Sequence, residues 1–205
     1  MRVLEISVKP EVRRISMVVD TEGPDCFLTS QMPHITRGLF RLIPRLASHT
    51  CHNGKGKSFR QECRNTEIPH LFEHLIIELQ LMAQQNADDH LRGETEWNWQ
   101  QDPYGRFHVT VEYQDEMLAI GSIRLAERIL AALDRRDVSL DIHAEVERLR
   151  LMYVLGREMA GAEPPRWATV AARTWSSVHP PVAAPAPIAP VLPSLFTDPH
   201  PIPVA

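Results

Sequence analysis

Cysteine is scarce in this 205-residue sequence, which has three cysteines, at positions 26, 51 and 63, and no CxxC spacing. An odd and scattered set argues against a disulfide framework, so we expect a reducing, cytoplasmic location. The first residues, MRVLEISVKPEVRR, lack the apolar core and small-residue cleavage site of a secretory signal. No apolar run is long enough to span a bilayer, and we therefore expect no membrane partner.

Charge of a single sign is also lacking, because the net charge is −4 and neither sign clusters. Without a basic stripe, the sequence gives no reason to expect a nucleic-acid partner. Proline is rare in most of the sequence, but eleven of the 17 prolines lie from Pro164 onward. We predict one globular domain at 1–161 and a disordered Pro/Ala-rich tail at 162–205, which is suited to docking a partner.

Hydrophobic periodicity gives the expected order of helices and strands. Alternating apolar residues predict strands at 2–9, 13–20 and 107–113, and a further strand near 93–99 is left open. Helical spacing predicts helices at 34–47 (bent at Pro44), 66–84, 115–133 and 139–160. The predicted fold class is therefore α+β, with a small, mostly antiparallel sheet that is covered by helices.

The predicted helix at 66–84 contains the pattern His-x-x-Glu-His at positions 70–74. At 100° per residue, one broad apolar stripe is formed by Ile68, Leu71, Phe72, Leu75, Leu79 and Met82. His70, His74, Glu78 and, at the margin, Glu73 point the other way. Because Ile77 lies among these polar residues, we expect the helix to be covered on both sides. The polar side chains would then lie in a cleft, where they need partners.

A metal ion would provide those partners. Histidines one helical turn apart have Cα atoms about 6 Å apart, and their rings can share a Zn²⁺ ion. Glu73, directly before His74, can hold a water molecule, accept its proton as a general base and pass it to a leaving amine. This is the inverse of the His-Glu-x-x-His order of zinc peptidases. The sequence thus predicts a zinc site with His70 and His74 as ligands and Glu73 as the catalytic residue; cleft histidines without a metal are the alternative.

The motif does not identify a third metal ligand. Glu78 is our first choice, although its Cα lies about 9 Å along the axis from an ion between the histidines. It could instead orient another ligand from behind. The other candidates are Cys51, Glu112 and Glu116. Two histidines of a polar loop, His49 and His52, either join the site or are solvated.

Arginine and tryptophan side chains suggest how a substrate could be held. Arg92 and Arg106 flank the segment 93–99 and could pair with substrate carboxylates, although ordinary surface positions explain them equally well. Trp97 and Trp99 either stack on a substrate or belong to the core or an interface. We therefore take Arg92 and Arg106 as the candidate substrate-binding residues.

The helix sequence PHLFEHLIIELQ resembles the corresponding helix in the N-terminal domain of cyanophycin synthetases. The likeness continues upstream in LFRLIPRLASHTC and downstream in YGRFHVTVEYQDE, and covers roughly residues 1–135. In that family the domain adjoins an ATP-grasp module and a Mur-ligase-like module, for which this chain is too short. The resemblance implies a domain that holds a polymer of aspartate and arginine and, where its metal site is intact, cuts it. It also implies His70 and His74 as ligands and Glu73 as the base.

The sequence departs from the family pattern at two places where substrate would be gripped. Thr50 stands where an arginine precedes the cysteine, and GETEWNW at 93–99 replaces a basic segment. The first hypothesis is a cytoplasmic zinc hydrolase that cleaves peptide or isopeptide bonds of a polyamide, with cyanophycin-like polymer as the leading substrate. The second is a non-catalytic module that keeps the fold and binds a polymer or a partner synthetase. Hydrolysis of an unrelated peptide is a third possibility.

Overall fold

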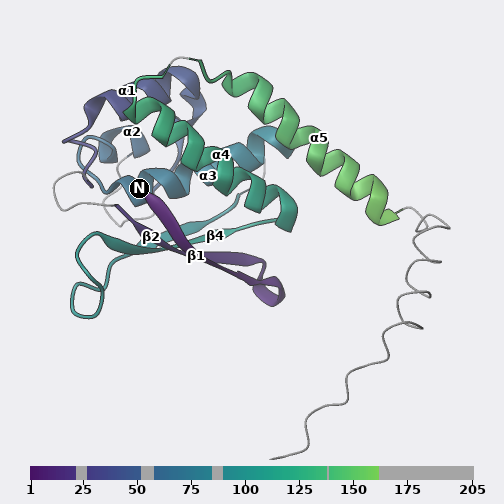
Figure 1. Ribbon diagram of the computed structural model, residues 1–205, viewed down its shortest axis with the longest axis horizontal. Helices are drawn as coiled ribbons and strands as arrows, with labels where there is room; N and C mark the ends of the chain where they lie inside the picture. Colours follow the sequence, from purple (N-terminus) through teal and green to yellow (C-terminus); the bar gives the residue numbers. More distant parts are fainter. Residues whose placement is uncertain (22–26, 52–57, 85–89, 138, 162–205) are drawn as a thin grey trace, which may run out of the picture. The chain divides into compact units, whose positions relative to one another are not determined.

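The computed structural model describes residues 1–21, 27–51, 58–84, 90–137 and 139–161 (Figure 1). Its elements are β1 (Arg2–Lys9), the 3₁₀ turn η1 (Pro10–Val12), β2 (Arg14–Asp20), α1 (Pro33–Leu42), the 3₁₀ turn η2 (Pro44–Ser48), α2 (Phe59–Glu62), α3 (Ile68–Gln84), β3 (Gly93–Glu96), β4 (Arg106–Glu112), α4 (Glu116–Asp134) and α5 (Ile142–Gly161). The predicted α+β class is confirmed. The predicted tail, Cys26 and His52 lie outside the described residues.

The four strands form one antiparallel sheet in the order β1-β2-β4-β3. Every second residue of the two central strands is buried, and these residues are Ile15, Met17, Val19, Phe107, Val109 and Val111. Because side chains alternate between the two faces of a sheet, all of them point to the face that the helices cover. Figure 1 shows α1, α3 and α4 on that side. The prediction of a small antiparallel sheet covered by helices is confirmed.

Helix α3 lies at the centre of the domain, where it packs against β3 and β4 on one side and against α4 and α5 on another. Nearly all of its side chains are buried, including the polar Glu73, His74, Glu78 and Gln80. The expectation that this helix is covered on both sides is therefore confirmed. Burial of so many polar groups is unfavourable unless they find partners, so their contacts define the candidate site.

The predicted helix at 34–47 divides into two elements. Helix α1 ends at Leu42, and Pro44 begins the turn η2. Proline has no backbone N–H to donate and disfavours helical geometry at the preceding residue, and Ile43 has φ −131° and ψ 77°. This break turns the chain so that the residues after η2 run toward α3, where the turn η2 makes contact.

Two other local features differ from the sequence expectation. The short helix α2 was not predicted, although Ser58 and Gln61 form a capping box at its start. The sequence predicts that the motif helix begins at about Thr66, whereas α3 begins at Ile68. The Thr66 hydroxyl lies instead 2.8 Å from the ring nitrogen Nδ1 of His70, so this residue belongs to the candidate site.

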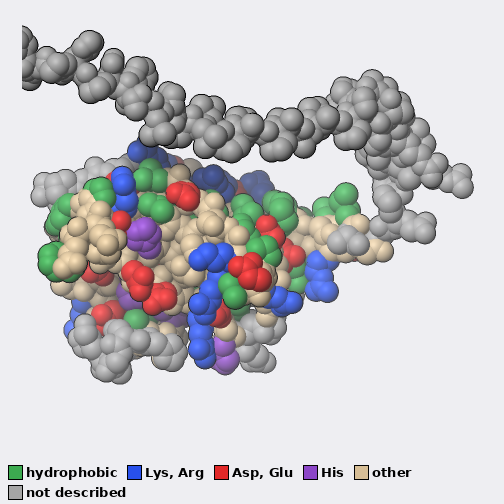
Figure 2. Space-filling model, turned by 90° about the horizontal axis from the view of Figure 1, so that it is seen from below, with side chains coloured by type: hydrophobic (Ala, Val, Ile, Leu, Met, Phe, Trp, Pro, Cys, Tyr) green, Lys and Arg blue, Asp and Glu red, His purple; other side chains and the backbone are tan. Residues whose placement is uncertain are grey.

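Helices α4 and α5 complete the layer on the covered face. Asp115 caps α4 by accepting a hydrogen bond from the Leu118 N–H at 2.9 Å, as expected for an acid that begins a helix. None of the helices in the described ranges is long and apolar enough to cross a membrane. Figure 2 shows acidic, basic and histidine side chains interspersed on one face of the molecule.

Candidate metal centre

Polar side chains of α3 line a cavity of about 1160 Å³. Its walls are formed by residues 45–51 after α1, by residues 67–81 in and just before α3, by residues 90–97 that include β3, and by side chains of β2 and β4. The cavity thus joins segments that are far apart in the sequence. His70, Glu73 and His74 all line it.

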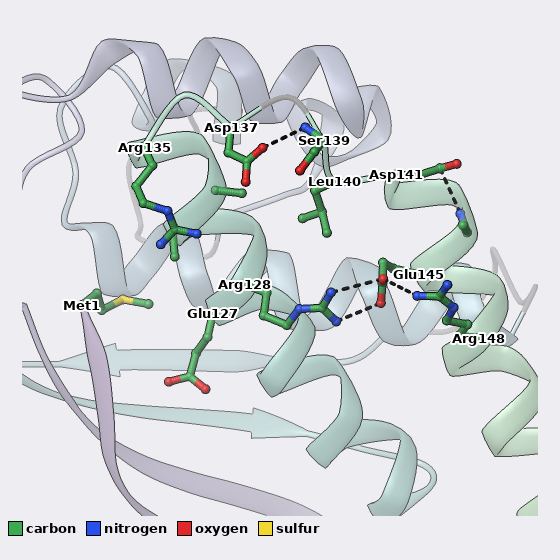
Figure 3. Close-up of a pocket in the computed structure, with 13 residues that line it drawn as sticks. Met1, Glu127, Arg128, Arg135, Asp137, Ser139, Leu140, Asp141, Glu145 and Arg148 are labelled. Carbon is green, nitrogen blue, oxygen red and sulfur yellow. Dashed lines mark hydrogen bonds and ion pairs between the residues drawn. The ribbon is translucent and has the colours of Figure 1, made fainter.

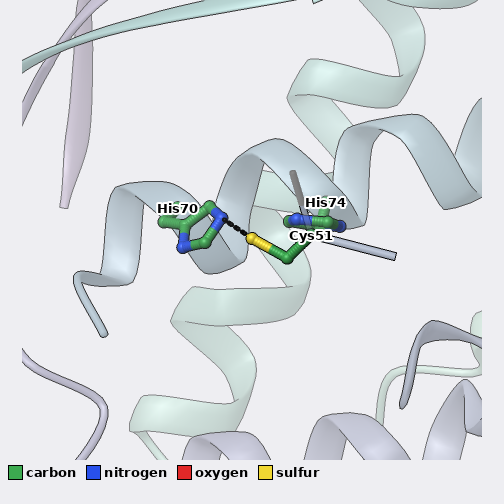
Figure 4. Close-up of side chains that lie close together, drawn as sticks. All are labelled: Cys51, His70 and His74. Atoms are coloured by element: carbon green, nitrogen blue, oxygen red, sulfur yellow. Dashed lines mark hydrogen bonds between the residues drawn. The ribbon is translucent and has the colours of Figure 1, made fainter. Parts of the chain in front are cut away.

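Three side chains in this cavity form a group that could hold a metal ion. One potential ligand atom each from Cys51, His70 and His74 lies within 4.8 Å of the others. The Cys51 sulfur is 3.4 Å from Nε2 of His70, and the centroids of the two histidine rings are 5.0 Å apart. Figure 4 shows the thiol and the His70 ring pointing toward each other. The third member of the group is therefore Cys51, one of the alternatives to Glu78.

Hydrogen bonds determine which nitrogen of His70 is available. The Thr66 hydroxyl donates to a carboxylate oxygen of Glu67 at 3.2 Å, so its oxygen accepts from Nδ1–H of His70 at 2.8 Å. The proton of a neutral imidazole is then on Nδ1, and Nε2 keeps its lone pair. That lone pair faces Cys51, so His70 is oriented as a ligand.

A second chain of contacts orients His74. The carboxylate of Glu78 pairs with Arg45 at 3.3 Å and accepts from Nε2–H of His49 at 2.8 Å. A carboxylate only accepts, so the His49 proton lies on Nε2, and Nδ1 of that imidazole tautomer accepts from Nδ1–H of His74 at 3.1 Å. This leaves Nε2 of His74 with a free lone pair. The His74 ring also stacks on Phe59, with centroids 3.7 Å apart.

Burial keeps both motif histidines neutral. The pKa of His74 is lowered to about 2, mainly by burial and further by the nearby rings of His70 and His49. The pKa of His70 is lowered by burial, against the opposing charges of Glu67 and Glu62. A neutral imidazole is the form that binds a metal, so neither ring has to lose a proton first.

The two described cysteines have different surroundings. Cys63 is buried, and burial raises its pKa well above the usual range, so it remains a thiol. Cys51 is only partly buried, lines the cavity and contacts His70. Of these two cysteines, Cys51 is therefore the one placed to act as a metal ligand.

Glu73 lies in the same cavity, on the side of β3. Its Oε2 accepts a hydrogen bond from the Thr95 hydroxyl at 2.5 Å. Burial raises the pKa of Glu73 to about 7, whereas the Thr95 hydrogen bond acts in the opposite direction. Gly93 leaves room for this carboxylate, because a Cβ there would lie 2.5 Å from Oε1. Glu73 is thus held by β3 beside the cysteine–histidine group.

The structure separates the remaining candidates. Glu78 contacts Arg45 and His49 and is not in the group of three ligand atoms, and Glu116 is exposed at the start of α4. Glu112 lines the cavity but pairs with Arg14 at 3.0 Å.

The two candidate substrate-binding arginines lie in different surroundings. Arg92 lines the cavity and is exposed. Arg106 pairs with Asp20 at 3.7 Å. It is not among the described residues that line the cavity. The structure thus brings Arg92 near the centre, but not Arg106.

Two aromatic residues also belong to the cavity wall. Trp97 and Phe107 line it and contact each other, with ring centroids 5.7 Å apart. Trp99 is 73% exposed and does not line the cavity as described. His108 is exposed and pairs with Asp102, as its position on the open side of β4 predicts.

From the sequence, His49 either joins the site or is solvated, and Gly93 and Thr95 have no predicted role in the site. All three lie outside the motif and reach it only through the tertiary fold, so no local spacing identifies them. The one available signal for His49 was its position two residues before the candidate ligand Cys51.

A second cavity lies between α4 and α5 (Figure 3). The Glu145 carboxylate in its wall binds Arg128 at 2.9 Å and Arg148 at 2.6 Å. Glu145 is therefore already paired with two guanidinium groups, both of which are exposed. The candidate metal centre is therefore assigned to the first cavity, which contains the cysteine–histidine group.

Removing the Glu78 carboxylate tests whether it orients His74. If the group binds a metal ion such as zinc, Glu78→Ala is expected to weaken that binding by about 10–100-fold, because His49 loses the acceptor that fixes its ring. Glu78→Gln keeps an oxygen that can accept from His49 and should recover much of the affinity. Competition with a chromogenic zinc chelator gives both values, and equal affinities for the two variants would contradict this role.

Comparison with known families gives one match. The sequence model of the cyanophycin synthase-like N-terminal domain matches residues 16–135. The match runs from β2 to the end of α4 and includes the whole cysteine–histidine group and Glu73. No curated protein matches the chain.

Proposed function

Because the chain belongs to the cyanophycin synthase-like N-terminal domain family, we propose that it is a zinc-dependent hydrolase of peptide or isopeptide bonds. The leading substrate is a cyanophycin-like polymer of aspartate and arginine. One observation supports this most strongly: Cys51, His70 and His74 converge in a cavity that the carboxylate of Glu73 also lines. A carboxylate beside the metal-binding group is what a general base for hydrolysis requires.

The donor atoms fit zinc better than a hard cation. Zinc binds thiolate sulfur and imidazole nitrogen, whereas magnesium and calcium prefer oxygen. Three protein ligands also correspond to a catalytic site, in which the fourth position is open to water or substrate. A bound zinc ion would activate water and polarise the substrate carbonyl.

The chain's own residues provide the proton transfers. Thr95 holds Oε2 of Glu73, which leaves Oε1 to accept a proton from the attacking water. The protonated Glu73 then donates to the leaving amine, so that the nitrogen departs in neutral form. Arg92 at the cavity wall can pair with carboxylates of the substrate.

Direct incubation with the polymer tests this proposal. The zinc-loaded protein should shorten soluble Asp-Arg polymer and release new amino groups, which size-exclusion chromatography and amine labelling detect. A chelator should stop the reaction and added zinc should restore it. Polymer that is bound but not shortened would favour the non-catalytic binding module instead.

Gly93→Ala tests whether the position of Glu73 matters. The new Cβ would lie 2.5 Å from Oε1 and 2.6 Å from Cγ of Glu73, so the carboxylate has to move. A displacement of this kind at a catalytic group can cost about 100-fold in rate. We therefore expect a large fall in kcat/KM with unchanged zinc content.

Gly121→Ala in α4 is the matched control for this variant. Its Cβ would lie 2.5 Å from Cδ1 of Leu149, so it introduces a similar clash at a position that does not line the cavity. It should lower stability by about 1–3 kcal/mol and leave kcat/KM unchanged. Similar losses of activity in both variants would mean that Gly93 acts only through folding.

A further inference from the structure

The strand β3 forms one edge of the sheet, and its position suggests how a substrate is held. Among the described residues, β3 pairs only with β4. Its residues Gly93, Glu94 and Glu96 are exposed, and Thr95 is partly buried. Gly93, Glu94 and Thr95 also line the cavity that contains the cysteine–histidine group. Within the described part of the chain, the outer edge of β3 is therefore unpaired and borders the candidate site.

The hydrogen-bond pattern shows which backbone groups of β3 point outward. The Glu112 N–H donates to the Arg92 carbonyl at 2.8 Å, so these two residues form a hydrogen-bonded pair. Such pairs alternate along an antiparallel ladder, and the register pairs Glu94 with Thr110 and Glu96 with His108. The backbone groups of Glu94 and Glu96 therefore point toward β4. Those of Gly93 and Thr95 point away from it.

The other side of β4 gives an independent check of this alternation. If even-numbered residues of β4 bond to β3, odd-numbered residues have to bond to β2. The Tyr113 N–H donates to the Arg13 carbonyl at 3.0 Å, and the Gly105 carbonyl accepts from the Thr21 N–H at 3.0 Å. Both bonds join an odd-numbered residue next to or in β4 to the chain of β2, as this alternation requires.

The two residues with outward backbone groups are also the two that touch Glu73. The Thr95 hydroxyl donates to Glu73, and the Gly93 backbone lies so close that a Cβ would clash with its carboxylate. A chain bound along this edge would therefore pass directly beside the catalytic carboxylate. An edge further away would not bring a substrate amide to Glu73.

We propose that β3 is a docking edge, along which the substrate binds in extended form as an added strand. This inference rests on the proposed hydrolase function and specifies how the polyamide is held. Main-chain N–H groups of the substrate donate to the carbonyls of Gly93 and Thr95, and main-chain carbonyls of the substrate accept from the N–H groups of the same two residues. Recognition through the backbone suits a repetitive polyamide, because each repeat offers the same pattern of amides. Side chains then project from the added strand in alternate directions.

Amide hydrogen exchange tests the proposal at single-residue resolution. The zinc-loaded Glu73→Gln variant, which should bind without turnover, is studied by NMR with and without soluble Asp-Arg polymer. The amides of Gly93 and Thr95 should exchange at least about 10-fold more slowly when the polymer is bound. The amides of Glu94 and Glu96, already bonded to β4, serve as internal controls and should change little.

The possible outcomes separate this inference from the proposed function. Saturable binding with slower exchange at Gly93 and Thr95 supports the docking edge. Saturable binding without that change overturns the docking edge and leaves the hydrolase proposal in place. Absence of any binding overturns the polymer as substrate and the docking edge with it.

Two substitutions at Thr95 give a second test that does not depend on assigned spectra. Thr95→Val and Thr95→Pro both remove the hydroxyl, but only proline also removes the outward N–H. An edge strand tolerates proline where the N–H does not bond to the neighbouring strand. Polymer affinity should be about five-fold lower for the proline variant than for the valine variant, as for one lost hydrogen bond. Equal affinities in two folded variants would contradict the proposal.

Discussion

Replacing Glu73 by glutamine is expected to lower kcat for polymer hydrolysis by about 100- to 10,000-fold while zinc content stays near one ion per chain. Glutamine has nearly the same shape, and its amide oxygen can still accept from the Thr95 hydroxyl. It cannot, however, accept a proton from water and return it to an amine. Initial rates of amine release, with metal analysis of the same samples, measure both quantities.

A carboxylate away from the cavity provides the matched control for this variant. Glu147 lies on α5 and is half-exposed, so Glu147→Gln makes the same chemical change without touching the candidate centre. Its kcat should equal that of the unmodified protein. Turnover that survives in the Glu73→Gln variant would remove Glu73 from the mechanism, whatever the metal content.

Loss of both motif histidines is expected to abolish metal binding. In the His70→Ala/His74→Ala variant only Cys51 remains of the three ligands, so zinc content should fall below about a tenth of an ion per chain. Hydrolysis should fall to the background rate. Metal analysis after gel filtration, together with the polymer assay, tests this prediction.

Thermal unfolding provides a second measurement on the same variant. A ligand that binds only the folded state stabilises it by about 2.7 kcal/mol at a concentration of 100 times its Kd. Added zinc should therefore raise the Tm of the unmodified protein and of a His143→Ala control on α5. It should not raise the Tm of the double variant. Stoichiometric zinc in the double variant would place the metal elsewhere.

The motif helix could be predicted because its pattern is local. Two histidines four residues apart lie on one side of any α-helix, and the apolar residues between them predict its burial. The third member of the group could not be identified with this reasoning. Cys51 is 19 residues before His70, and tertiary contacts, including those of η2 with α3, bring the two together.

The first choice of third ligand, Glu78, illustrates the same limit. Helix geometry predicts Glu78 on the side of the histidines, and in the structure its carboxylate contacts His49 at 2.8 Å and Arg45 at 3.3 Å, two partners from outside the helix that no local spacing reveals. Similarly, the strand that holds Glu73 has only four residues, GETE, without an apolar alternation. Its register with β4 gives Gly93 and Thr95 their positions, and register is a property of the folded sheet.

The glutamates of β3 have a consequence for self-association. An exposed strand edge tends to recruit the same edge of another molecule, which leads to aggregation. Glu94 and Glu96 carry negative charge along this short edge, and two copies brought together would place like charges opposite each other. The edge can thus remain open to a ligand in a crowded solution while copies of the protein repel one another there.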